Sequence, residues 1–327
     1  LYARRQRQMC IRDSFCSLLG ILIVRTQVSK SPAVALRFGT FLSPIIFLVF
    51  AGLSIYYSPN IELSVFYSVL TGAVGGIMIG LITEYYTGGD TEDSPVGKIA
   101  KSGETGPATV MITGLSVGMQ SVVLPLFVIA GIIGVSTYFS GLYGVGIAAV
   151  GMLATVGITM AIDAYGPVAD NAGGIAEMSG MKPEVREITD SLDELGNTTA
   201  AIGKGFAIGA AALAALAIIA AYMLATGLES LSLNDPRVLM GMFIGGTIPF
   251  LASSITMTAV GDAAFEMIEE IRRQFREIPG LLEGKAEPDN AKCVDIATKA
   301  ALNKMLLPGA IAIGSPVVVG FALGLSL

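Results

Sequence analysis

The chain has 327 residues, of which 53% are hydrophobic and only 14% are charged. Its mean hydropathy of +0.70 lies outside the range of soluble globular domains and indicates a polytopic membrane protein. The absence of histidine from the sequence excludes histidine-based catalysis and histidine metal ligands, and a net charge of −6 argues against a nucleic-acid partner.

The predicted fold class is all-α, a polytopic bundle of transmembrane helices. One crossing of a bilayer takes about 20 predominantly apolar residues. A short apolar stretch, Phe15–Val24, looks like the remnant of one span, and seven longer runs follow it. These runs are Phe38–Tyr57, Ser64–Thr83, Val110–Phe139, Val145–Ile162, Phe206–Thr226, Val238–Val260 and Leu306–Leu327.

The two ends of the chain differ from the rest. Residues 1–14 are basic and polar, and neither the clean apolar core nor the cleavage site of a signal peptide follows them. We interpret residues 1–14 as a non-native leader and residues 15–327 as the membrane region. The last apolar run stops at Leu327 without a polar flank, so we expect the chain to be a fragment of a single larger domain.

Lysine and arginine fall in alternate loops between these runs. From Arg25 onward, fifteen of these residues lie in one set of loops, and only Arg237 lies in the other. Cytoplasmic loops of membrane proteins carry the excess of positive charge. The charged loops, including the region Asp163–Lys204, are therefore predicted to face the cytoplasm.

Carboxylates and amides gather in two stretches, Asp163–Glu177 and Gly196–Gly205, beside apolar runs. Polar groups at such depths are costly unless they bind something. Asp163 and Asp170 are seven residues apart, which places them on one face of a helix. Asp170 and Asn171 offer the hard oxygen ligands that Mg²⁺ shares with water and phosphate, although a solvated helix C-terminus explains the same residues.

The sequence pattern alone does not decide the roles of several further polar residues. Asn197 either caps a helix that starts there, or belongs to a helix N-terminus that faces a metal-bound phosphate. Glu84 lines an ion path or, as the pattern favours, marks the membrane interface. Asp190, Asp193 and Glu194 are expected in a solvated loop.

Four stretches of the sequence resemble the membrane-bound ion-translocating inorganic pyrophosphatases. The similar stretches are Ala161–Gly209, Gly80–Thr87 (GLITEYYT), Gly261–Glu287 and Pro288–Gly309. They agree in order and spacing, and the resemblance covers about residues 15–327. It implies a homodimer of sixteen-helix subunits that hydrolyses Mg-pyrophosphate on the cytoplasmic side and pumps H⁺ or Na⁺, in a prokaryotic cytoplasmic membrane.

The resemblance also implies roles for particular residues. Asp170 would be a Mg²⁺ ligand, and Asn197 would help to hold the Mg-pyrophosphate complex. Asp163 and Glu84 would be buried carboxylates that bear on transport. No certain catalytic residue is assigned within the chain.

Two small residues are expected to decide whether K⁺ is needed. Ala200 and Gly203 occupy the positions that, in this family, separate K⁺-requiring members from members with a built-in lysine. A bound K⁺ or a lysine ammonium supplies the same positive charge near the substrate phosphates. Alanine with glycine resembles the K⁺-requiring class, so Mg²⁺ and K⁺ are the expected cofactors.

The sequence also departs from the family pattern. The upstream Asp-rich helix pair and the closing helices of the family have no counterpart here, so we expect the chain alone not to hydrolyse pyrophosphate. Mg-dependent hydrolysis by the purified chain would contradict this. Two alternatives remain: a secondary ion-coupled transporter, whose broken helices bear carboxylates, and a truncated remnant without function. The sequence does not indicate whether the pumped ion is H⁺ or Na⁺.

Overall fold

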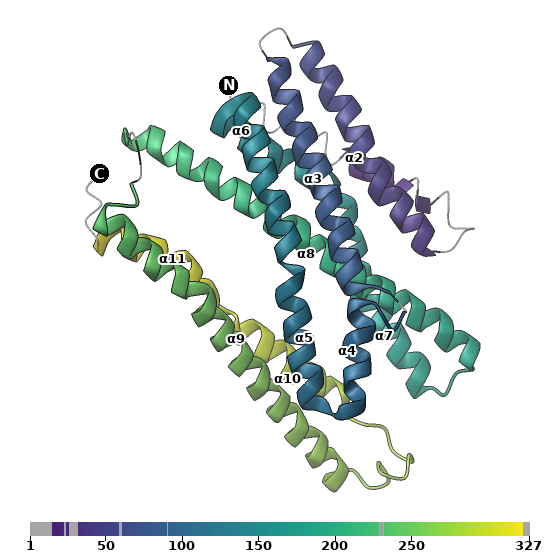
Figure 1. Cartoon of the computed structure of the whole chain (residues 1–327). Coiled ribbons are helices and arrows are strands. Elements are labelled where there is room, and N and C mark those ends of the chain that lie inside the picture. Colours follow the sequence, from purple (N-terminus) through teal and green to yellow (C-terminus); the bar gives the residue numbers. More distant parts are fainter. Residues whose placement is uncertain are drawn as a thin grey trace. The chain divides into compact units, whose positions relative to one another are not determined.

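The computed structural model describes residues 15–22, 24–25, 32–58, 61–89, 91–228, 230 and 232–322. The predicted leader, residues 1–14, lies outside them. Within the described residues the secondary structure is helical and includes no strand, which confirms the all-α prediction (Figure 1). The helices are α2 (Pro32–Tyr56), α3 (Leu63–Thr87), α4 (Pro95–Ser102), η1 (Gly103–Thr105), α5 (Pro107–Ser121), α6 (Val123–Met152), η2 (Leu153–Thr155), α7 (Val156–Met178), α8 (Pro183–Thr226), α9 (Pro236–Glu277), α10 (Asn290–Lys304) and α11 (Leu306–Ala322).

The chain forms two compact units, Leu1–Tyr222 and Met223–Leu327. Among the described residues, six helical segments are long and apolar enough to cross a membrane by length and composition. The protein is therefore a polytopic membrane protein, as the composition predicts. Four of these six segments begin in the first unit, which also holds the sequence-predicted site residues.

The longest segment, Pro107–Met152, contains a reversal of the chain. Within α6, Ser140 and Gly141 leave helical geometry, and Gly141 has a φ of +60°. Glycine takes this left-handed conformation without the steric cost that a Cβ would bring. The predicted break between the runs ending at residue 139 and starting at residue 145 is therefore confirmed.

Both halves of α6 pack on the same part of α3. A Cβ on Gly75 would meet Ile132 from the half before the reversal, and a Cβ on Gly76 would meet Met152 from the half after it. Small residues let helices approach closely where packing, rather than water, drives association. The next predicted run, Val145–Ile162, continues through the short 3₁₀ turn η2 into α7.

The second unit is built on α9. This helix has 42 residues, about twice what one crossing needs, and α10 and α11 run back beside it (Figure 1). The Lys304 ammonium group of α10 pairs with the Asp262 carboxylate of α9 at 3.0 Å. Arg273 binds Glu270 at 2.7 Å, and the Glu270 carboxylate is buried.

A buried amide joins α9 to the start of α10. Gln274 is only 3% exposed. Its Nε2 donates to Glu270 at 2.9 Å and to the carbonyl oxygen of Asp289 at 3.0 Å, and its Oε1 accepts the Asp289 backbone N–H at 2.8 Å. These bonds fix the two ends of the loop between the helices.

Candidate functional site

Helices α7 and α8 form an antiparallel hairpin that carries most of the predicted site residues (Figure 1). They approach most closely where Gly166 meets Gly196: a Cβ on Gly196 would lie 2.8 Å from the Gly166 Cα. Beside this crossing, the Tyr165 hydroxyl donates to the carbonyl oxygen of Leu192 at 2.9 Å. The two backbones are thus held together by direct contact and by a hydrogen bond.

The same pairing continues on both sides of the crossing. Toward the hairpin turn, the Arg186 guanidinium lies 3.4 Å from the Glu177 carboxylate. In the other direction, a Cβ on Gly203 would lie 3.3 Å from the methyl group of Thr159. One antiparallel register therefore relates α7 and α8 over about five turns of helix.

This register brings polar groups together near the crossing. Asp170 falls at the level of Asp193 on the neighbouring helix. The Asn197 amide donates to the Asp193 carboxylate at 3.1 Å. Asp170 and Asn197 are exposed and Asp193 is half-buried, and Asn197 lies one helical turn beyond Asp193 along α8.

Three predictions about local structure are wrong. Asn197 does not start a helix, because α8 begins fourteen residues earlier at Pro183. Asp170 does not lie at a helix end, because α7 runs on through Pro167 to Met178. Asp193 and its acidic neighbours belong to α8 rather than to a loop. In each case a polar stretch of helix continues beyond the apolar run that the sequence emphasises.

Asp163 lies farther from the hairpin turn than Asp170, and the register places it opposite Thr199 and Ala200 of α8. Asp163 and Ala200 are half-buried, and Gly203 is buried one turn farther along α8. At Gly203 a Cβ would also meet the end of Met160 at 3.4 Å. The predicted K⁺-determining positions therefore lie on the inner side of the hairpin, at the depth of the Asp163 carboxylate rather than of Asp170.

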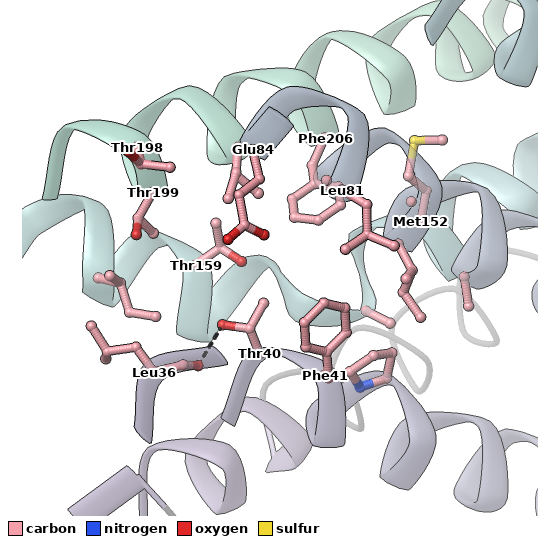
Figure 2. Close-up of a pocket in the computed structure, with 18 of the residues that line it drawn as sticks. Leu36, Thr40, Phe41, Leu81, Glu84, Met152, Thr159, Thr198, Thr199 and Phe206 are labelled. Atoms are coloured by element: carbon pink, nitrogen blue, oxygen red, sulfur yellow. Dashed lines mark hydrogen bonds between the residues drawn. The ribbon is translucent and has the colours of Figure 1, made fainter. Parts of the chain in front are cut away.

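Glu84 extends from α3 into a pocket, which we call the inner pocket, with a volume of about 60 Å³. Figure 2 shows its carboxylate pointing toward Thr159 of α7, with Thr198 and Thr199 of α8 nearby. Glu84 is thus brought close to the hairpin, whereas Asp170 and Asn197 do not line this pocket. The sequence pattern favours a position of Glu84 at the membrane interface and does not predict that its side chain lines an enclosed pocket.

A second cavity, the polar hollow, adjoins the inner pocket and has a volume of about 800 Å³. The two share Leu81, Glu84, Leu195 and Thr198. The hollow is otherwise lined by Tyr85, Gly88, Gly89, Thr91, Asp93, Ser94, Ser191 and Glu194. Glu84 therefore lies at the junction between an apolar pocket and an acidic one.

Sequence reasoning missed two hydroxyl residues of this region, Thr40 and Thr159. Both line the inner pocket, Thr40 from α2 and Thr159 from the start of α7, the helix that also carries Asp163. The available signal was spacing, because Thr159 stands one helical turn before Asp163 on the same face. Thr40 is an isolated hydroxyl in an apolar run and gives no comparable signal.

The oxygen donors near the crossing suit Mg²⁺. This ion usually binds one or two carboxylates and completes its shell with water and phosphate oxygens. Asp170 and Asp193 provide such carboxylates at one level. No group of three or more acidic, cysteine or histidine side chains within the described ranges could hold a metal ion by itself.

Comparison with known proteins decides the family. The family described as "Inorganic H+ pyrophosphatase" matches residues 8–327. The chain belongs to this family. Its match begins within the stretch 1–14 that the composition sets apart.

Relatives within this pyrophosphatase family carry pump names of different kinds. A "Putative K(+)-stimulated pyrophosphate-energized sodium pump" of Clostridium tetani is 53% identical over 318 residues, covering 94% of this chain and 46% of the relative. A "K(+)-insensitive pyrophosphate-energized proton pump" of Methanosarcina mazei is 44% identical, with 95% and 47% covered. A "K(+)-stimulated pyrophosphate-energized sodium pump" of Thermotoga maritima is 43% identical, with 94% and 46% covered. The chain thus spans about half the length of these relatives.

Proposed function

We propose that this chain is part of a pyrophosphate-energised ion pump, in which the α7–α8 hairpin binds Mg-pyrophosphate and responds to its hydrolysis. The observation that carries the proposal is the pairing of α7 with α8, in which Asp170 lies opposite Asp193 and the Asn197 amide donates to the Asp193 carboxylate. Oxygen ligands there match the needs of Mg²⁺, and the family and its relatives act on pyrophosphate. The reaction class is metal-assisted hydrolysis.

In this proposal, Asp170 is a direct Mg²⁺ ligand, and Mg²⁺ when bound neutralises phosphate charge. Asn197 holds the Mg-pyrophosphate complex through its amide. Asp193 accepts a hydrogen bond from that amide and thereby fixes its orientation. The chain's own contribution is to bind and orient the substrate on two paired helices.

Deeper groups would serve transport. Asp163 and Glu84 are placed to take part in moving H⁺ or Na⁺, since both lie on the inner side of the bundle, away from the Asp170 level. Ala200 and Gly203 would leave room for K⁺, whose charge replaces that of a lysine. Relatives of both kinds match this chain, so the proposed K⁺ requirement is based on Ala200 and Gly203.

The membrane arrangement is proposed from charge. The loops rich in lysine and arginine face the cytoplasm, which places the hairpin turn near Lys182 on that side. The membrane is a prokaryotic cytoplasmic membrane, consistent with the organisms of the relatives. The working form is a homodimer in the lipid bilayer, as in the family that the sequence resembles.

A grafting experiment tests the proposal. This chain replaces the aligned half of the Clostridium tetani relative, and Mg-dependent pyrophosphate hydrolysis is measured in membranes with and without K⁺. We expect K⁺-stimulated hydrolysis that Asp170→Asn lowers at least 100-fold, while Glu104→Gln in the exposed η1 turn leaves it unchanged. Full activity of the Asp170→Asn graft would refute the site.

Transport is measured on the same graft in sealed vesicles. Pyrophosphate-driven uptake of Na⁺ that persists with a protonophore would identify a sodium pump. Acidification that a protonophore abolishes would identify a proton pump. Hydrolysis without either ion movement would contradict the assignment of transport roles to Asp163 and Glu84.

A further inference from the structure

The inner pocket is enclosed by several helices. It lies between α2, α3 and the α7–α8 hairpin, with further walls from the end of α6 (Figure 2). Most of its walls are apolar, and they include Phe41, Phe206 and Ile202. A cavity needs about 10–15 Å³ to hold one water molecule, so 60 Å³ has room for roughly four to six groups of that size.

Two hydroxyls and the carboxylate of this pocket are available as acceptors. The Thr40 hydroxyl donates to the Leu36 carbonyl oxygen at 2.9 Å, and the Thr199 hydroxyl donates to the Leu195 carbonyl oxygen at 2.7 Å. Each proton is thus used within its own helix, which leaves the oxygen lone pairs to accept. Glu84 adds a carboxylate, which accepts up to four hydrogen bonds and therefore serves more than one donor.

The described residues that line the pocket include neither lysine nor arginine, and neither asparagine nor glutamine. The pocket therefore combines a negative group, several acceptors and apolar walls that include two aromatic rings. A ring face attracts a cation, and an apolar wall favours hydrocarbon over water. A ligand that satisfies all of these features has an ammonium group and a short alkyl body.

We propose that the inner pocket is a binding site for a small alkylammonium ion of about four to six non-hydrogen atoms, with its nitrogen at Glu84 and its alkyl chain toward Phe41 and Phe206. n-Butylammonium has this size. The proposal is independent of pyrophosphate, because Asp170 and Asn197 lie outside the pocket. It adds a ligand site at Glu84, a carboxylate to which a transport role is also proposed above.

The polar hollow provides the approach to this site. Its ionisable lining includes Glu84, Asp93 and Glu194 but no lysine or arginine among the described residues. Clefts lined by one sign of charge concentrate counter-ions. The hollow therefore collects cations and repels pyrophosphate, and Glu84, which both cavities share, receives the ammonium group at their junction.

The first experiment uses the unsubstituted full chain, purified in detergent without pyrophosphate. Binding of n-butylammonium chloride is followed by saturation-transfer NMR, with n-butanol as the neutral compound of matched size. We expect saturable binding with a dissociation constant on the order of 1 mM, and at least tenfold weaker binding of butanol. Equal affinity of the two compounds would overturn the proposal, because the carboxylate would then contribute nothing.

Variants locate the site. Glu84→Gln should weaken butylammonium binding at least tenfold, Glu84→Asp should retain part of it, and Glu104→Gln outside both cavities should leave it unchanged. Far-ultraviolet circular dichroism checks that each variant keeps its helices. Unchanged binding by a folded Glu84→Gln protein would place the ligand elsewhere and overturn the proposal.

Competition separates this ligand class from an inorganic ion. Butylammonium binding is titrated with KCl and NaCl at constant ionic strength held by tetramethylammonium chloride. We expect weak competition, because an alkali ion gains nothing from apolar walls. Displacement of butylammonium by K⁺ or Na⁺ at equal or lower concentration would show an alkali-ion site and overturn the assignment of an alkyl ligand.

Discussion

Replacing Gly196 by alanine tests how closely α7 and α8 must approach. The added Cβ would lie 2.8 Å from the Cα of Gly166, whereas carbon atoms in contact prefer about 3.5–4.0 Å. The helices must therefore separate by about 1 Å at their crossing. Overpacking of this kind costs about 1–3 kcal/mol, and the better helix propensity of alanine returns about 0.5–1 kcal/mol. We expect a net destabilisation of about 0.5–2 kcal/mol.

The partner glycine offers a matched control. A Cβ on Gly166 would lie 3.6 Å from the Gly196 backbone, which is ordinary contact. Gly166→Ala should therefore be neutral or stabilising by as much as about 1 kcal/mol, although it adds the same methyl group at the same crossing. Both free energies of unfolding are measured from the loss of helical circular dichroism when the detergent-solubilised chain is titrated with SDS.

The relative stability and activity of Gly196→Ala and Gly166→Ala test whether the two helices cross this closely. Gly196→Ala should also lower pyrophosphate hydrolysis of the graft about 100-fold, because a displacement of about 1 Å at the Asp170 level misplaces the substrate. Gly166→Ala should retain most of the activity. If Gly196→Ala were as stable and as active as Gly166→Ala, the close crossing would not exist as described.

Three further predictions concern other parts of the chain. Gln274→Leu should destabilise the second unit by about 1–3 kcal/mol in SDS titrations, because it removes the hydrogen bonds by which Gln274 joins the buried Glu270 carboxylate to the Asp289 backbone, whereas Gln120→Leu at an exposed position of α5 should not. The Arg273 guanidinium and the Gln274 amide lower the pKa of Glu270 to about 2, at a position beyond the apolar run of α9. The stability difference between wild type and Glu270→Gln should therefore be constant above pH about 4.5 and shrink as the pH falls toward 2, as measured by thermal melts. In the graft, Ala200→Lys should abolish K⁺ stimulation of hydrolysis, and Ala200→Met, which lacks the charge, should not.

The positions of the apolar runs predicted most of the fold. The runs starting at Ser64 and Val238 lie within α3 and α9, and the break between residues 139 and 145 appears as the reversal at Gly141. These features follow from burial in lipid, because a membrane helix must satisfy its own backbone within one apolar segment. The sequence pattern records that requirement directly.

The polar ends of the helices could not be predicted in the same way. The stretch from Pro183 to Gly196 forms the first turns of α8, but it contains carboxylates at a density that is also typical of a solvated loop. What fixes it as a helix is tertiary pairing: Arg186 with Glu177, and the Leu192 carbonyl with the Tyr165 hydroxyl. Contacts between distant residues of this kind leave little trace in a local pattern.

The length of α8 matters for the mechanism of the proposed pump. Asn197 at the polar level and Phe206 at the inner pocket lie on one uninterrupted helix, about 13 Å apart along its axis. Had Asn197 capped a separate helix, a shift at the substrate level could have been absorbed by the loop before it. Because α8 is continuous and Gly196 packs on Gly166, such a shift must move Thr198 and Thr199 relative to Glu84. The hairpin can therefore transmit a change at Asp170 to the proposed transport carboxylates as a rigid-body motion.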